Sequence, residues 1–256
     1  MKPVLRWLGL VLLALGALQL FFVLRIAAMA VLDPESTTFQ RSDAWAQARS
    51  TGQVLWRQQW VAYADISEHL KRAVIAAEDD RFAHHEGVDW NAMEKAWERN
   101  AQAEERAARQ RAAAPAAAAV AAAAPASARP AKAPKVRGGS TITQQLAKNL
   151  LLSGERTLLR KSQEFVLALL LEQLLTKQRI LEIYLNNVEW GDGVFGAEAA
   201  AQHYFRKGAA RLTPAEAARL AVMLPAPKRF EKLPASAYLA GRTRTILARM
   251  RSAELP

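Results

Sequence analysis

Cysteine is absent from the 256-residue sequence, which excludes disulfides, thiolate nucleophiles and cysteine-based zinc sites. Acidic residues are outnumbered by basic ones, 24 against 35, so the formal net charge is +11. Such an excess suits an anionic partner, whether nucleic acid, lipid head groups or a phosphorylated substrate. The length leaves room for one medium domain with accessories and excludes a two-domain enzyme of ordinary size.

Strand signals are also few, since only residues 54–62 alternate weakly between apolar and polar side chains. Most of the remaining pattern predicts helices. Ser67 is a good N-cap for a helix reaching about Asp80, and Thr141 with Gln144 has capping-box spacing. Further helices are predicted over residues 157–187, which contain no glycine or proline, from 213 to about 224, and over 236–251. The sequence therefore predicts an all-α or nearly all-α domain.

The N-terminus carries a long apolar run. Residues 7–24 are interrupted only by Gln19, and Lys2 and Arg6 precede them. Eighteen residues of helix span roughly 27 Å, close to the thickness of a bilayer's hydrocarbon core. We therefore expect residues 1–32 to form a cytoplasmic tip and a single membrane anchor, with the rest of the chain on the outer side. The alternative is a cleaved signal peptide, because residues 28–30 are small enough for a cleavage site.

A low-complexity segment rich in alanine and proline runs over about residues 101–135. Alanine offers little side-chain area to bury, and Pro115 and Pro125 are expected to break any helix. The composition predicts a solvated linker or insertion. The alternative is a helical hairpin packed on the body.

Glu78 is a polar residue on an apolar helix face. At 100° per residue it lies on the same side as Leu70, Val74 and Ile75. Loss of hydration there would raise the pKa of the carboxyl and make it a candidate proton acceptor or donor. Two other interpretations are open: residues 78–80 form a solvated acidic helix end, or Glu78 pairs with Lys71.

The helix predicted after Thr141 follows Gly138, Gly139 and Ser140. Glycines before a helix N-terminus let backbone amides approach an anion, and Lys148 adds a positive charge further along. The alternative is that these polar residues only face solvent. Likewise, Arg160 and Glu164 have the spacing of an ordinary surface ion pair.

Four motifs follow one another along the chain. They are E-D-x-x-F-x-x-H-x-G at residues 78–87, GGSTITQQLAKN at 138–149, R-K-x-x-E at 160–164 and KQRILEIYLN at 177–186. Together they resemble the motifs of the bacterial peptidoglycan glycosyltransferases. No Ser-x-x-Lys or Lys-Thr-Gly motif occurs. The chain is therefore similar to the monofunctional members, which lack a penicillin-binding transpeptidase domain.

This resemblance implies a mainly α, lysozyme-like glycosyltransferase domain over residues 33–256, interrupted by the insertion at about 101–135, with one N-terminal transmembrane helix. It implies a polymerase of the bacterial cytoplasmic (inner) membrane, with its catalytic domain on the periplasmic or outer side. The substrate would be lipid II, a disaccharide-pentapeptide on undecaprenyl pyrophosphate, which is joined into β-1,4 glycan strands with release of the lipid pyrophosphate. Expected partners are the growing glycan chain, the membrane and other cell wall synthesis proteins, and no nucleic acid.

The resemblance also implies residue roles. Glu78 matches the base that deprotonates the acceptor's GlcNAc 4-hydroxyl for attack on the donor's MurNAc C1. Lys148 and Arg156 match cations that stabilise the leaving pyrophosphate, and Glu164 matches a second essential carboxylate that positions these cations or a divalent metal, Mg or Mn. No organic cofactor is expected. Residues matching substrate contacts are Ser140, Gln144, Gln145 and Asn149. Phe82 and His85 are interpreted as structural, with His85 holding the turn by hydrogen bonds.

Two rival functions stay open at this point. A lysozyme-like lytic enzyme would share the fold and cleave glycan with a single glutamate, but it needs no pyrophosphate-binding cations. A non-catalytic membrane-anchored scaffold would retain the motifs without activity. The basic helix over residues 236–251 is expected to present a solvated face, with contact to lipid head groups as the alternative.

Overall fold

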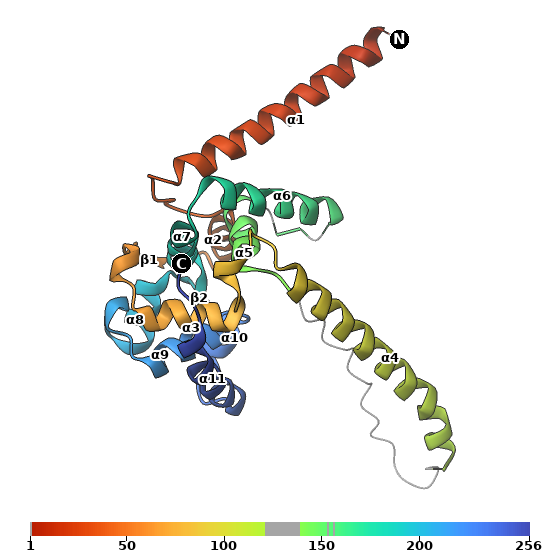
Figure 1. Cartoon of the computed structure of the whole chain (residues 1–256), viewed down its shortest axis with the longest axis vertical. Coiled ribbons are helices and arrows are strands. Elements are labelled where there is room, and N and C mark those ends of the chain that lie inside the picture. Colours follow the sequence, from red (N-terminus) through yellow and green to blue (C-terminus); the bar gives the residue numbers. More distant parts are fainter. Residues whose placement is uncertain (1, 121–138, 153, 156) are drawn as a thin grey trace. The chain divides into compact units, whose positions relative to one another are not determined.

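The computed structural model of the chain describes residues 2–120, 139–152, 154–155 and 157–256 (Figure 1). The chain divides into two compact units. The first unit holds Met1–Val88 and Thr141–Pro256, and the second holds Asp89–Ser140. Most of the predicted site residues therefore belong to the first unit. Ser140 belongs to the second, and Arg156 lies outside the described residues.

The apolar N-terminal segment forms helix α1 (Lys2–Ala28), in which Pro3–Ala28 is long and apolar enough to cross a membrane. Most of its side chains are exposed, but Ile26 and, just beyond the helix, Met29 are buried in the core of the first unit. Arg179 fixes the chain that follows by donating to the carbonyl oxygens of Met29 at 2.8 Å and Leu32 at 3.0 Å. The end of α1 is thus part of the folded body.

Helix α2 (Thr38–Thr51) has too few apolar residues for periodicity to predict it. Hydrogen bonds at its N-terminus fix where it begins. The Thr37 hydroxyl accepts from the backbone N–H of Gln40 at 3.0 Å, and the Gln40 side chain accepts from the N–H of Thr37 at 2.8 Å. Gln40 also donates to the carbonyl oxygen of Asn187 at 3.2 Å. This capping box therefore fixes both the start of α2 and its position against the end of α7.

Helix α3 (Glu68–Glu78) packs against α9 (Pro214–Met223) and α11 (Ala237–Arg249), as Figure 1 shows. The predicted caps Ser67 and Thr213 are confirmed, because each side-chain oxygen accepts a hydrogen bond from the first turn of its helix. The buried stripe of α3 includes Leu70 and Val74, again as predicted. The helix ends at Glu78, slightly earlier than expected.

A second group of helices surrounds α5 (Ile142–Leu151), whose predicted capping box between Thr141 and Gln144 is confirmed. It packs against α2, α6 (Leu158–Leu174) and α7 (Lys177–Asn187). The prediction of one uninterrupted helix over residues 157–187 is wrong. The break falls at Leu175 and Thr176, where the Thr176 hydroxyl accepts from the N–H of Arg179 at 3.2 Å and caps α7. A threonine can offer the backbone this alternative to continued helix without any glycine or proline.

A small sheet lies beside the helices, with strand order β1-β3-β2. β1 (Arg57–Gln58) is the extended piece predicted within residues 54–62, and it runs parallel to β3 (Val194–Phe195). β2 (Glu189–Gly191) pairs antiparallel with β3. Gly193 between them has a φ of +67°, and a Cβ there would collide with the backbone of Leu55. Glycine at 193 therefore allows the segment before β1 to approach the turn.

The first unit is completed by two short α-helices and four 3₁₀ turns. These are α8 (Ala197–Phe205), α10 (Pro227–Glu231), and the turns Tyr63–Asp65, Phe82–His84, Ala209–Arg211 and Met250–Ser252. The fold of the first unit is therefore mainly α, as predicted, because its three strands together contain only seven residues.

The described part of the second unit is mainly α4 (Trp90–Val120), which starts with the Asp89 carboxylate accepting from the N–H of Ala92 at 2.9 Å. The helix continues through Pro115, so the expectation that this proline breaks any helix is wrong. Proline removes one backbone donor at a cost of about 3 kcal/mol, and a run of alanine, the best helix former, offsets that cost over several residues. Pro125 and the remainder of the insertion as far as residue 135 lie outside the described residues.

Candidate active site

Glu78 is the last residue of α3, at the end of its buried stripe. Its carboxylate accepts a hydrogen bond from the Gln145 amide at 2.9 Å. Burial raises the pKa of Glu78, the hydrogen bond from Gln145 lowers it, the charge of Asp79 raises it, and Arg242 and Lys148 lower it, with a net rise. The prediction from the helix face is therefore confirmed. A carboxylate with a raised pKa accepts a proton more readily than an ordinary one.

Gln145 is held in place from its other side. Its amide oxygen accepts from the Tyr184 hydroxyl at 3.0 Å, which turns the NH₂ group toward Glu78. Tyr184 is buried, and burial raises the pKa of its phenol well above the usual value, with Glu78 and Asp79 adding to the rise. The phenol stays protonated and can only donate to this oxygen. The chain from Tyr184 through Gln145 to Glu78 thus orients the proposed acid–base group.

The alternatives for Glu78 do not match the structure. Lys71 donates to the carbonyl oxygen of Tyr63 at 3.1 Å and lies over its ring at 4.0 Å, so it does not pair with Glu78. Asp79 is buried, and only Asp80 is exposed, where it pairs with Arg249 at 3.0 Å. Residues 78–80 are therefore not a solvated acidic end.

Asp79 joins three segments beside Glu78. Its carboxylate contacts His85 Nε2 at 2.9 Å and accepts from the backbone N–H of Ile142, in the first turn of α5, at 2.9 Å. Phe82 is fully buried, with its ring edge-on to His85. These contacts confirm the structural interpretation of Phe82 and His85. They also place the start of α5, and hence Gln145, against the end of α3.

Lys148 lies one turn beyond Gln145 on α5 and lines a cavity of about 490 Å³. Burial lowers the pKa of its ammonium, Glu164 raises it, and the neighbouring charges of Arg160 and Lys161 lower it further. An anionic ligand in the cavity would favour the charged ammonium and so raise the pKa of Lys148 again. Other residues lining the cavity come from α2, α5 and the start of α6, among them Phe39, Ser42, Asn149, Leu152 and Arg160.

Glu164 is buried rather than part of an ordinary surface pair, with 3% of its surface exposed. Its two oxygens face Arg160 Nη1 at 2.9 Å and the Lys161 ammonium. Of these cations Arg160 also lines the cavity with Lys148. The carboxylate therefore holds Arg160 and Lys161 in position, whereas its expected action on Lys148 and Arg156 stays a prediction.

The other predicted site residues have different surroundings. Asn149 lines the same cavity as Lys148. Gln144 is buried, and its side-chain oxygen accepts from the N–H of Thr141, so the structure gives it a capping role. Ser140 is exposed at the end of the second unit, and Arg156 lies outside the described residues. Their substrate contacts stay predictions.

A divalent cation has no evident protein ligand set here. Among the described residues no group of three histidine, aspartate or glutamate side chains could hold a metal ion. Glu164, the carboxylate expected to do so, is already matched by Arg160 and Lys161. These residues do not fit a metal site made by the protein alone, so no step is assigned to a metal.

Sequence reasoning missed three contributors to this site. Tyr184 lies inside the K-x-x-I-L-E-x-Y-L-N motif, so its position there was an available signal. Phe39 and Ser42 on α2 reach the Lys148 cavity from more than 100 positions away in the sequence, with no motif to indicate it.

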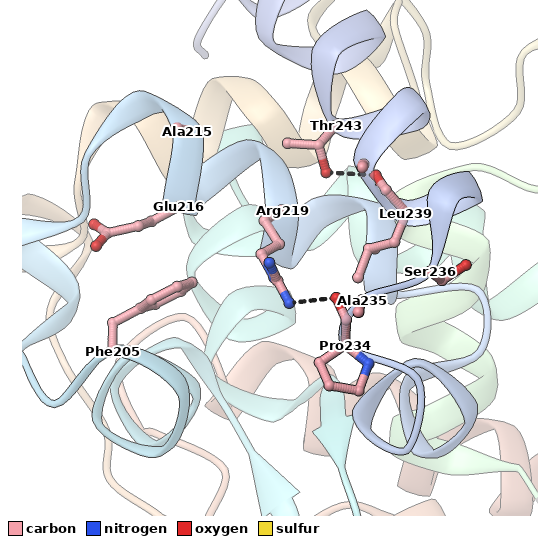
Figure 2. Close-up of a pocket in the computed structure, with 10 residues that line it drawn as sticks. Phe205, Ala215, Glu216, Arg219, Pro234, Ala235, Ser236, Leu239 and Thr243 are labelled. Atoms are coloured by element: carbon pink, nitrogen blue, oxygen red, sulfur yellow. Dashed lines mark hydrogen bonds between the residues drawn. The ribbon is translucent and has the colours of Figure 1, made fainter.

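Another cavity, of about 470 Å³, lies between α9 and α11 (Figure 2). Figure 2 shows Arg219 donating to the carbonyl oxygen of Pro234, at 2.8 Å, and Thr243 bonded to that of Leu239. None of the predicted site residues lines it.

Comparison with known proteins gives a consistent picture. Residues 47–110 and 115–251 match a family model described as transglycosylase. Proteins called biosynthetic peptidoglycan transglycosylase are similar over nearly their whole length. The one from Herminiimonas arsenicoxydans is 46% identical over 100% of this chain and 99% of its own. Those from Burkholderia thailandensis and Cupriavidus metallidurans are 47% and 48% identical, covering 100% and 89% of this chain and 90% and 87% of theirs.

Proposed function

This chain belongs to the transglycosylase family, and from that premise we propose that it polymerises lipid II into glycan strands with Glu78 as the catalytic base. The observation that carries the assignment is the hydrogen-bonded chain Tyr184–Gln145–Glu78. It gives a carboxylate of raised pKa a fixed direction, which general base catalysis needs.

In the proposed reaction, Glu78 takes the proton of the acceptor's 4-hydroxyl while that oxygen bonds to C1 of the donor. The bond from C1 to the pyrophosphate oxygen breaks with inversion, and the lipid pyrophosphate leaves with the electron pair. The desolvated carboxylate is a suitable acceptor because its protonated form is favoured by burial.

We assign stabilisation of the leaving group to the cations of the cavity beside α5. Lys148 and Arg160 line it, and Lys161 shares the Glu164 carboxylate with Arg160. Fixed positive charges beside developing negative charge lower a transition state without reorganisation during the reaction. A divalent cation, if the reaction needs one, would be held chiefly by the substrate's pyrophosphate.

These cations support the polymerase over the two rivals. A lytic enzyme cleaves glycan without releasing pyrophosphate, so it has no use for a cationic cavity next to its glutamate. A non-catalytic scaffold has no use for the Tyr184–Gln145–Glu78 chain. Keeping the Glu78 carboxylate away from water destabilises its charged form, and a scaffold would gain nothing in return.

We further propose that α1 is retained as an anchor in the inner membrane, with the body on the outer side. Cleavage after residue 30 would remove Ile26 and Met29, which are buried core side chains, and a hydrogen-bond acceptor of Arg179. Lys2 and Arg6 at the other end favour the cytoplasmic side. Association with other cell wall synthesis proteins stays a prediction.

The test is polymerisation of lipid II by the purified full chain in detergent or nanodiscs, with magnesium ions in one series and EDTA in another. The parent protein should release undecaprenyl pyrophosphate and form glycan polymer, and Glu78→Gln should reduce the rate about 10²- to 10⁴-fold. Glu68→Gln, which alters an exposed side chain on the same helix, is the matched control. Polymer formation by Glu78→Gln at the parental rate would show that Glu78 is not the base, and release of fragments from finished glycan instead would favour the lytic enzyme.

A further inference from the structure

A cavity of about 630 Å³ lies between β1 and the end of α8, and the mechanism above does not use it. Its lining is polar and cationic. The residues that matter are Trp56, Arg57 and Gln59 on the β1 side and Gln202, His203 and Arg206 on the α8 side.

The β1 wall is held rigidly. The N–H of Arg57 donates to the carbonyl oxygen of Gly193 at 2.8 Å, and the Trp56 ring packs against Phe195 at 5.4 Å between centroids. Gln58 donates to the carbonyl oxygen of Asn186 at 3.0 Å. A cavity with such a wall is formed before any ligand arrives.

Arg57 is oriented by a neutral partner. A guanidinium can only donate, so His203 Nδ1, 3.1 Å from Arg57 Nη1, must accept. The ring proton therefore sits on Nε2, which donates to Glu231 at 3.0 Å. Arg57 is thus fixed in direction, and no carboxylate among the described residues pairs with it.

Arg206 occupies a backbone position that normally favours glycine. It follows the last residue of α8 with a φ of 58°, and it is the one non-glycine residue with positive φ in the part of the chain that the structure describes. Glycine is the usual residue at this position because it has no Cβ penalty. The Arg206 side chain has no ion pair with another described residue, so nothing inside the protein accounts for arginine here.

The charge of this cavity is unbalanced. The cavities around Arg219, Arg25 and Lys148 each include a carboxylate in their lining, from Glu216, Asp33 and Asp43 respectively. This one has two guanidinium groups and no carboxylate.

The lining indicates what kind of anion would fit. Guanidinium groups match the planar geometry of a carboxylate. Gln59 has no side-chain partner among the described residues, and the Gln202 oxygen is free while its NH₂ group donates to Glu198. Such amides can both donate to and accept from peptide groups, and the partly exposed Trp56 ring offers an apolar contact. This combination favours a peptide carboxylate over a bare phosphate.

We propose that this cavity binds a peptide through its free carboxylate, and that the peptide is the one carried by the glycan substrate or product. Helix α7 connects the two sites: Tyr184 bonds to Gln145 beside Glu78, and one turn later Asn187 accepts from Gln58, which lines the cavity. The binding chemistry stands on the cavity alone, whereas the source of the peptide rests on the proposed function.

The experiment measures binding without turnover. The full-length Glu78→Gln protein in nanodiscs is titrated with the soluble pentapeptide of the substrate, either as the free acid or as its C-terminal amide, by calorimetry at low ionic strength. We expect the acid to bind at least about 10-fold more tightly than the amide, because one charge-assisted pair is lost in the amide. Equal binding of the two peptides, or none by the acid, would overturn the proposal, whatever the polymerisation assay shows.

Arg206→Gly is the most informative variant. Glycine suits the backbone there, so the protein should fold with an unchanged or higher Tm, while the preference for the acid falls about 10-fold. Arg57→Gln should reduce the preference as well. Arg211→Gln and Arg244→Gln remove exposed charges outside the cavity and should leave it unchanged. If these controls lose the preference equally, net charge alone explains the binding and the proposal is wrong. Inorganic phosphate that competes as well as the acid peptide would also contradict it.

Discussion

Glu78 and Glu164 are two glutamates of the same unit whose partners differ in kind. Glu78 accepts from a neutral amide, Gln145, at 2.9 Å, and its pKa is raised by burial. Glu164 lies at the same distance from Arg160 and also contacts Lys161. A carboxylate beside a neutral donor can exchange a proton, whereas one between two cations mainly fixes where those cations lie. The residue type is the same, and the partners decide the role.

After Glu78→Gln, we expect the largest loss of turnover when a cation of the cavity beside α5 is removed. Lys148 lines the cavity that we propose for the leaving group. Lys148→Ala should lower the turnover number about 10²-fold, because it removes a fixed positive charge from that cavity. Steady-state kinetics with lipid II would measure it. Lys232→Ala, which removes an exposed lysine elsewhere, is the control. An unchanged turnover number in Lys148→Ala would contradict the leaving-group role.

Changing the second glutamate should have a smaller effect on rate. Glu164→Gln leaves the cations of Arg160 and Lys161 without their counter-charge, and we expect turnover to fall about 10-fold with a Tm lower by about 2–6 °C. Glu172→Gln is a matched control, since Glu172 is also a glutamate with little side-chain exposure and a lysine partner, Lys177 at 2.8 Å. Its Tm should fall similarly while its turnover at low temperature is kept. Equal loss of turnover in both would mean that Glu164 acts only through stability.

The Gln145 amide, the neutral partner of Glu78, can be disturbed without changing Glu78 itself. Tyr184→Phe removes the donor to the Gln145 oxygen, so the amide can turn that oxygen toward Glu78 and raise its pKa further. Since the base must be deprotonated, the acidic limb of the pH profile of kcat/KM should move to higher pH, which lowers kcat/KM on the acidic side of the profile. Tyr204→Phe, which removes a hydroxyl bonded to the Trp190 carbonyl at 2.8 Å, should leave the limb in place. A limb that does not move in Tyr184→Phe would contradict this orientation.

The smallest expected effect is on stability. Because the pKa of Glu78 is raised above its ordinary value of 4.5, ionisation is less favourable in the folded than in the unfolded state. The parent therefore loses stability as the pH rises from about 4.5 through the raised pKa, and Glu78→Gln does not. Glu78→Gln should thus have a Tm about 1–4 °C above the parent at pH 8, with the gap closing below pH 4. Scanning calorimetry at the two pH values would test it, and a lower Tm at pH 8 would contradict the burial argument.

Helix capping accounts for most of what could be predicted of the fold. Ser67, Thr141 and Thr213 each begin a helix as expected, because a cap acts within one turn of its own position. The break at Thr176 was missed because the surrounding apolar residues suit either one helix or two. Pro115 was misjudged in the opposite direction, since the local rule for proline was outweighed by the alanines around it.

The candidate site was predictable where its chemistry is carried by a helix face or a motif. Glu78 could be placed on the buried side of its helix from spacing alone, since helical periodicity is a local property. Gln145 could be named but not given its partners, because these come from α3 and α7, both far away in the sequence. The roles of Phe39 and Ser42 on α2 had no local signal at all.

The sequence by itself determined the apolar N-terminal helix, the helical class of the body and the family, and it singled out Glu78 and Lys148 as candidate site residues. These depend on composition, local periodicity and the order of motifs. Only the tertiary structure decided that Glu78 faces a neutral amide while Glu164 faces two cations, and that Arg57 and Arg206 share a cavity without a carboxylate. The physical reason is that desolvation and charge pairing depend on which distant segments pack together, a property that no local stretch of sequence contains.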